Sequence, residues 1–234
     1  YYLHSMKTEL ENTLIRNRAD FHPVVDFDPV KEKLFHFDFT LANTELNASD
    51  IADTNSFSHY VNNKLKSTGS KYGIGGYNEN RTLYKRSGLF EGAEARSIHL
   101  GIDIWGPAGT PVYAAMGGMV HSFAFNDNFG DYGATVILLH QLGTVTFHTL
   151  YGHLGLDDIA QMSEGAYIAR GEIVGHFGKP EENGNWPPHL HFQVIKDMRL
   201  MLGDYPGVCT LSERNAYLAN SPDPDLILNM TKYI

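Results

Sequence analysis

The chain has 234 residues, a formal net charge of −9, 42% hydrophobic residues and 19% charged residues. This composition can build a sizeable core and is untypical of a disordered chain. The acidic balance argues against a dedicated nucleic-acid-binding protein, which needs a basic face. No apolar run approaches the ~18 residues that span a bilayer. The single cysteine, Cys209, excludes an intrachain disulfide framework and a cysteine-clustered zinc site, and we expect it to be a small buried residue.

The N-terminus shows no basic stretch followed by an apolar core, so no export signal is visible. If Met6 is the native start, the protein is expected to be cytoplasmic. If a segment was removed before Tyr1, the chain is a mature secreted or periplasmic form. The sequence leaves both alternatives open.

Residues 1–89 form an N-terminal α+β region to which the sequence assigns no role. Apolar residues recur at helical spacing between Phe57 and Leu65, which predicts a helix capped by Thr54 or Asn55 and stopped by Gly69. Phenylalanines alternate with polar residues over 35–39, which predicts a strand with one buried face. The glycine-rich segment 73–84 predicts a structured loop.

The sequence predicts a β-domain over residues 90–199. Short runs of β-branched and aromatic residues are separated by glycine and asparagine, which is typical of a mainly antiparallel fold. The predicted strands cover 112–115, 119–125, 134–140, 145–151, 167–169, 173–177 and 190–195. Segments 111–120 and 166–174 resemble each other weakly, each reading as strand, glycine turn and strand. This repeat suggests a β-sandwich folded over on itself.

Residues 200–234 form a helical C-terminal extension. Thr210 and Glu213 fit a capping box at the start of a helix, and Pro222 and Pro224 end that helix. We expect this extension to act as packing material.

Histidine is the residue type that carries chemical information, and the first site motif is His99-Leu-Gly-Ile-Asp103. Alternate residues of a strand share a face, so His99 and Asp103 point the same way with Gly101 between them. The glycine leaves an empty space beside an imidazole and a carboxylate, which suits a divalent metal. A surface histidine and aspartate on a strand is the alternative interpretation.

The second motif is His189-Leu-His191-Phe192, in which alternation places both histidines on one face and the apolar residues on the other. The histidine face looks either into a cleft or out to water. A third histidine, His153, follows Gly152 at the end of a predicted strand, where site residues gather at the rim of a sheet.

Together these residues indicate a catalytic zinc site. His99, Asp103 and His191 give three protein ligands and leave the fourth tetrahedral position for water. The remaining His153 and His189 could serve as base and proton donor, since histidine ordinarily titrates near neutral pH. The chain has no H-E-x-x-H motif that would supply a glutamate for this task.

Residues 97–195 resemble the lysostaphin-type zinc endopeptidases of the duplicated-hybrid-motif fold. The resemblance rests on five motifs in this order: His99-x-x-x-Asp103, Ala108-Gly-Thr-Pro-Val112 with Gly118-x-Val120, Tyr151-Gly-His153-Leu154, Gly171-Glu-x-Val-Gly175 and His189-Leu-His191-Phe192. It implies one zinc per chain held by His99, Asp103 and His191, with His153 and His189 as catalytic histidines. The implied substrates are peptide bonds of peptidoglycan, in glycine-rich bridges or in stem and cross-link peptides.

The chain also departs from the family pattern. Asn185-Trp-Pro-Pro188 replaces a Ser/Thr-Gly segment before the second histidine motif, and Gln193 stands where an acidic residue is frequent. The family's loop tyrosine is not assigned to Tyr77 or Tyr84 by spacing.

Three alternatives stay open at this point. A non-catalytic relative would keep the fold as a binding or activating module, although all five site positions are retained. A cytoplasmic peptidase would act on other peptides. Asn78 or Asn80 could supply an amide oxygen that blocks the metal site and keeps the enzyme latent.

Overall fold

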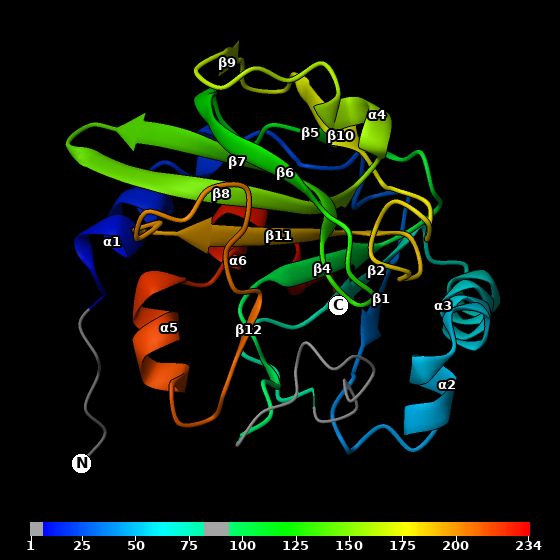
Figure 1. Ribbon diagram of the computed structural model, residues 1–234. Helices are drawn as coiled ribbons and strands as arrows, with labels where there is room; N and C mark the ends of the chain where they lie inside the picture. Colours follow the sequence, from blue (N-terminus) through cyan, green and yellow to red (C-terminus); the bar gives the residue numbers. More distant parts are fainter. Residues whose placement is uncertain (1–6, 82–93) are drawn as a thin grey trace.

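The computed structural model describes residues 7–81 and 94–234, and a large mixed sheet dominates them (Figure 1). The eight strands of this sheet lie in the order β1-β2-β4-β11-β8-β7-β6-β9. Their bounds are β1 (Leu34–Phe37), β2 (Tyr72–Gly75), β4 (Ile102–Trp105), β6 (Gly118–Asn126), β7 (Gly133–Leu142), β8 (Val145–Leu154), β9 (Tyr167–Ile168) and β11 (His189–Ile195). All neighbours pair antiparallel except β1 and β2, which are parallel. The mainly β prediction is confirmed.

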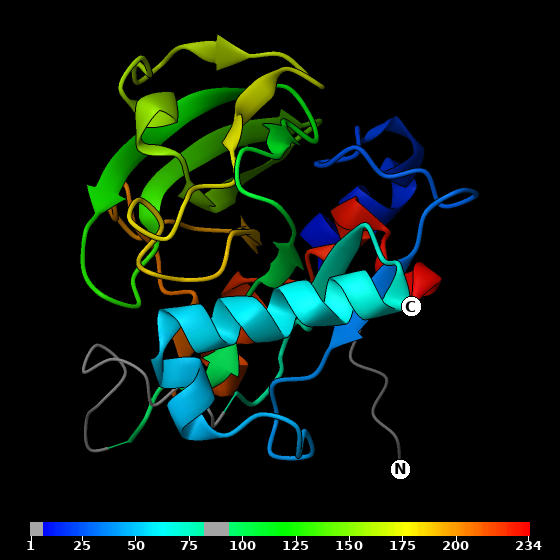
Figure 2. The ribbon, with the colours of Figure 1, turned by 90° about the vertical axis from the view of Figure 1, so that its right-hand side faces the viewer.

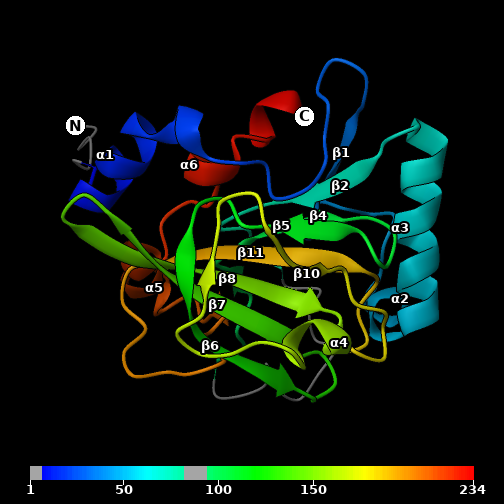
Figure 3. The same cartoon turned by 90° about the horizontal axis from the view of Figure 1, so that it is seen from above.

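A second, two-stranded sheet pairs β5 (Pro111–Tyr113) with β10 (Ile173–His176) and lies over the large sheet (Figure 3). Val112 and Val174 of this small sheet pack in one buried cluster with Val136 and Tyr151 of the large sheet. The two repeats predicted from the sequence pair with each other in both layers, because β5 pairs with β10 and β6 pairs with β9. Burial of the apolar faces between the layers explains the sandwich.

The N-terminal region adds β1 and β2 to the sheet, with β2 paired to β4. Helix α3 (Thr54–Thr68) follows α2 (Ala48–Ala52) and runs along this end of the molecule (Figure 2). The predicted stop is confirmed, since Gly69 caps the helix with a φ of 64°. The N-cap is Asp53, one residue earlier than predicted, and its side chain accepts from the Ser56 amide.

The glycine-rich loop prediction for residues 73–84 was wrong for residues 73–75, which belong to strand β2 (Tyr72–Gly75). A β-carbon at Gly73 would overlap the ring of Phe37 on the neighbouring strand. Glycine therefore serves close packing in the sheet here, and local composition does not distinguish this role from a turn. Residues 82–84 of the predicted loop lie outside the described residues.

An aromatic cluster joins the N-terminal region to the β-domain. Phe37, Phe39 and Phe57 pack with Trp105 of β4 and with Trp186, which precedes β11. The rings of Phe37, Phe39 and Phe57 each lie within 6.2 Å of the Trp105 ring, measured between centroids. Aromatic pairs of this kind stabilise a fold by more than the burial of their area alone would give.

The domain boundaries expected at residues 89 and 199 stay a prediction.

The C-terminal extension is helical as predicted. It contains α5 (Arg214–Asn220), α6 (Asp225–Leu228) and a 3-10 turn (Thr231–Tyr233) after the short strand β12 (Val208–Cys209), which pairs with β3 (Ile98–His99). Thr210 and Glu213 do bond to each other, just ahead of α5. Cys209 is buried, as predicted.

The remaining helices are short. Helix α1 (Glu9–Arg16) packs against α6, a 3-10 turn (Arg18–Asp20) follows it, and α4 (Leu156–Ile159) follows β8. Within the described ranges, no helix has the length and apolar character needed to cross a membrane.

Candidate metal centre

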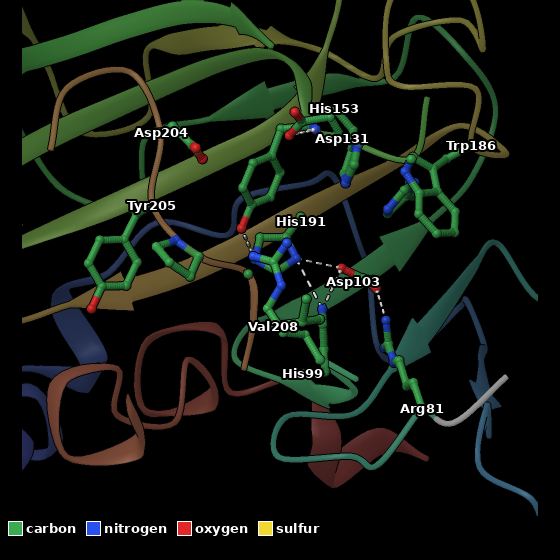
Figure 4. Close-up of a pocket in the computed structure, with 16 residues that line it drawn as sticks. Arg81, His99, Asp103, Asp131, His153, Trp186, His191, Asp204, Tyr205 and Val208 are labelled. Carbon is green, nitrogen blue, oxygen red and sulfur yellow. Dashed lines mark hydrogen bonds and ion pairs between the residues drawn. The ribbon is translucent and has the colours of Figure 1, made fainter. Parts of the chain in front are cut away.

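Strand register brings the predicted ligands together. His191 of β11 lies directly opposite Asp103 of β4, and opposite residues of neighbouring strands share a face of the sheet. His99 ends β3, two residues separate it from the start of β4, and its side chain reaches the same place (Figure 4). All three side chains are buried, with 2 to 3% of each residue exposed. The sequence motifs lie about ninety positions apart, and sheet pairing unites them.

Three ligand atoms face one another in this cluster. His99 Nε2 lies 3.1 Å from His191 Nδ1, and Asp103 Oδ1 lies 3.0 Å from His191 Nδ1 and 3.3 Å from His99 Nε2. Tetrahedral zinc with bonds of about 2.0–2.2 Å holds its ligands about 3.3–3.6 Å apart. The cluster is therefore the right size for such an ion after a small relaxation.

Hydrogen bonds on the outer sides of both imidazoles fix which nitrogen carries the proton. His99 Nδ1 lies 3.0 Å from the Gly76 carbonyl oxygen, to which only an N–H can donate. His191 Nε2 lies 2.9 Å from Gln193 Oε1. The Gln193 amide is oriented in turn, because its nitrogen donates to the carbonyl of Pro206 and to Ser221 Oγ.

It follows that His99 Nε2 and His191 Nδ1 present lone pairs to each other and to the Asp103 carboxylate. With both imidazoles in this neutral form, three acceptor atoms face one another, and a bound cation would satisfy all three. This donor set of two imidazoles and a carboxylate suits a divalent transition metal such as zinc.

Gly101 supplies the space that the sequence predicted. A β-carbon there would lie 2.5 Å from His191 Cε1 and Nε2, and 2.8 Å from the Phe192 carbonyl oxygen. The gap beside His99 and Asp103 is thus filled by the ring of His191. Any side chain at residue 101 would displace a ligand.

Arg81 is a site residue that sequence reasoning missed. Its Nη1 donates to Asp103 Oδ2 over 2.5 Å, and its Nε donates to Glu79 Oε2 over 2.6 Å. Burial alone would raise the pKa of Asp103, but His99 and Arg81 beside it hold that pKa well below its usual range. Burial and the charge of Arg81 lower the pKa of His99, which keeps the imidazole neutral and able to bind a metal.

The two remaining predicted histidines also lie at this site. The rings of His153 and His189 stack with centroids 4.1 Å apart, and both residues are buried. A register shift at the end of β8 and a φ of 62° at His153 mark a bulge, a feature that re-aims side chains next to active sites. His189 lies opposite Trp105 of the neighbouring strand β4. The two rings stack with their centroids 3.9 Å apart.

Both of these imidazoles present Nε2 as an acceptor. His153 Nδ1 lies 2.9 Å from the Asn183 carbonyl oxygen, and His189 Nδ1 lies 2.8 Å from that of Pro187. Each Nδ1 must therefore donate, which leaves the lone pair on Nε2. Burial lowers the pKa of His189 to about 3, and burial next to the other site imidazoles, His189 and His191, lowers the pKa of His153 well below its ordinary value. The pair is neutral at neutral pH and can accept a proton.

A cavity of about 210 Å³ opens onto this cluster. It is lined by all five predicted site residues together with Arg81, Arg96, Gly130, Asp131, Tyr132, Trp186, Asp204, Tyr205, Pro206, Gly207 and Val208. Tyr132 Oη lies 3.3 Å from His191 Nε2. Burial and nearby carboxylates raise the pKa of Tyr132 well above its usual value, so the phenol keeps its proton.

Other sequence candidates lie elsewhere. Asn78 Oδ1 accepts from Arg214 Nε at 2.7 Å, and neither Asn78 nor Asn80 lines the cavity, in contrast to the alternative in which one of them blocks the metal site. Tyr77 donates to the Ser221 carbonyl oxygen, while Tyr84 lies outside the described residues. His140 bonds Gly117 and Thr149, away from the cluster.

Residues 97–201 match the model of "Peptidase family M23". The DD-carboxypeptidase/endopeptidase Mpg of Neisseria meningitidis is 34% identical over 97 residues, which is 42% of this chain and 20% of that protein. The chain thus matches about one fifth of the length of this relative.

Two solved structures are similar to parts of this chain. The catalytic domain of the antimicrobial peptidase lysostaphin from Staphylococcus simulans is 21% identical with a TM-score of 0.40, over 68% of this chain and 96% of that one. A zinc-containing peptidase from Vibrio cholerae is 29% identical with a TM-score of 0.33, over 42% of this chain and 27% of that one. The match of residues 97–201 and the resemblance of their motifs agree, so this segment of the chain is similar to the peptidases of family M23.

Proposed function

We propose that this chain is a zinc-dependent endopeptidase that hydrolyses peptide bonds in the stem or cross-link peptides of peptidoglycan. The observation that carries the proposal is the convergence of three ligand atoms, His99 Nε2, His191 Nδ1 and Asp103 Oδ1, within 3.3 Å of one another. The family match over residues 97–201 and the two neutral histidines beside the cluster support it.

His99, Asp103 and His191 would hold the ion. When bound, zinc supplies a Lewis acid that lowers the pKa of a water in its open position to about 7. The protein adds a largely buried environment around the ion, because each of the five site residues is buried.

His153 and His189 would move the protons of the reaction. Their Nε2 lone pairs are free of the main-chain carbonyls that hold Nδ1, so either can take a proton from the attacking water. The same ring, once protonated, would deliver that proton to the leaving amine. The main-chain contacts at Asn183 and Pro187 hold both rings in the tautomer that this role needs.

The name of the Neisseria relative combines a carboxypeptidase and an endopeptidase, and it directs the choice of test substrates. The purified protein should contain one zinc per chain and should cleave defined wall peptides, among them D-Ala-containing cross-links and Gly-Gly bridges. Metal binding without cleavage of any of these peptides would favour a non-catalytic binding or activating module. Cleavage of unrelated peptides alone would contradict the substrate class.

A further inference from the structure

Asp103 uses its two carboxylate oxygens differently. Oδ1 faces both candidate ligand nitrogens, while Oδ2 accepts from Arg81 Nη1 at 2.5 Å (Figure 4). The side chain of Arg81 is fully buried and that of Asp103 is 2% exposed. A charged pair shielded to this degree is not loosened by solvent, so Oδ2 is held away from the metal position.

Arg81 contacts Asp103 although it lies outside residues 97–201, the segment that matches the family model. Main-chain hydrogen bonds fix residues 78–81 beside 97–99: the Asn78 amide donates to His99, the His99 amide to Glu79 and the Arg81 amide to Ser97, over 2.8 to 2.9 Å. The backbone that carries Arg81 is therefore tied to the backbone that carries His99.

Glu79 holds the guanidinium from its other side. It accepts from Arg81 Nε at 2.6 Å through one oxygen and from the Phe39 amide at 3.2 Å through the other. The Phe39 ring lies 5.4 Å from the guanidinium carbon, within range for a cation–π contact. The guanidinium is thus fixed by the Glu79 carboxylate, the Phe39 ring and Asp103, and the segment just after β1 helps to position it.

We infer that Arg81, anchored by Glu79, is a positioning residue that restricts Asp103 to one metal-coordinating oxygen. The inference rests on the zinc site of the proposed function. A carboxylate that binds through both oxygens would take an additional coordination position, and a catalytic site needs that position for water or substrate. The N-terminal region is then part of the metal centre, in contrast to the blocking role considered from the sequence.

Cobalt(II) substitution of the full-length protein tests this inference, because the visible absorption of cobalt reports coordination geometry. We compare the unaltered protein with the double variant Glu79→Gln, Arg81→Met, which removes a buried carboxylate together with its guanidinium. Arg170→Met is the matched control, since Arg170 is exposed and donates to the Asp20 carbonyl. Circular dichroism establishes that each variant is folded.

We expect one cobalt per chain in all three proteins. The visible absorption of the double variant should fall about twofold or more as the second oxygen of Asp103 joins the metal, while the control keeps the strong absorption of a four-coordinate site. Arg81→Lys keeps a charge but loses the guanidinium fork, so its spectrum should lie between those of the unaltered protein and the double variant. It replaces the double variant in the test if the double variant does not fold. An unchanged spectrum in the folded variant overturns the inference. Failure of the unaltered protein to bind metal would instead contradict the proposed function.

Discussion

The imidazoles of His153 and His189 stack 4.1 Å apart, and each donates its Nδ1 proton to a main-chain carbonyl oxygen. Neither Nδ1 can therefore serve as a base, and both Nε2 atoms are acceptors. In the proposed function, His153 and His189 handle protons while His99 and His191 hold the metal, although His189 and His191 share one strand.

The first prediction follows from this separation. Replacing His153 or His189 by alanine should leave one zinc bound per chain and reduce the rate of peptide cleavage by a factor of about 10²–10⁴, because a general acid–base group is lost. Zinc content and turnover on a wall peptide are measured on the same preparation. His36→Ala, on the exposed side of β1, is the control and should be fully active. Loss of zinc from either site variant would contradict the division of roles.

The second prediction concerns Gln193, whose Oε1 accepts from His191 Nε2. Gln193→Leu should weaken zinc binding about 10- to 100-fold, because the imidazole loses the acceptor that keeps Nδ1 unprotonated and correctly oriented. Competition with a chelating indicator measures the affinity. Gln141→Leu makes the same chemical change at an exposed site on β7 and should leave the affinity unchanged. Equal affinities for the two variants would mean that Gln193 does not orient His191.

The third prediction concerns Gly101. Gly101→Ala places a methyl group 2.5 Å from the His191 ring, so the ring or the strand must move. We expect the variant to lose tight zinc binding, measured by equilibrium dialysis, while circular dichroism still shows a β-rich fold. Tight binding of zinc to this variant would show that His191 can occupy another position.

The fourth prediction concerns stability and pH. Burial lowers the pKa of His140 to about 4 from its ordinary 6.5, so the folded protein holds this group neutral where the unfolded chain takes up a proton. The free energy of unfolding is therefore unaffected by this group above pH 6.5. It decreases as the pH falls from 6.5 towards 4, because the unfolded chain takes up a proton that the folded protein does not. The loss amounts to about 3 kcal/mol, at up to about 1.4 kcal/mol per pH unit.

Urea unfolding of the metal-free protein between pH 6.5 and 4 measures this effect. The variant His140→Gln should show a shallower dependence of the unfolding free energy on pH than the unaltered chain. Identical slopes would mean that His140 is not the buried neutral group responsible.

The amino-acid sequence determined the elements that depend on short-range patterns. Short runs of β-branched and aromatic residues between glycines and asparagines located the strands from β5 to β11 to within a few residues, and a glycine that tolerates positive φ marked the end of α3. The motifs also singled out His99, Asp103, His153, His189 and His191 in the sequence, and all five line one cavity.

Only the tertiary structure decided which groups support that site. Strand β2 was missed because its glycines accommodate Phe37 of a strand far away in the sequence. Arg81 and Tyr132 carry no local signal, since each acquires its role through a contact with a residue 22 or 59 positions away. A local pattern records which face of an element is buried, whereas the partner across that face is set by how the whole sheet folds.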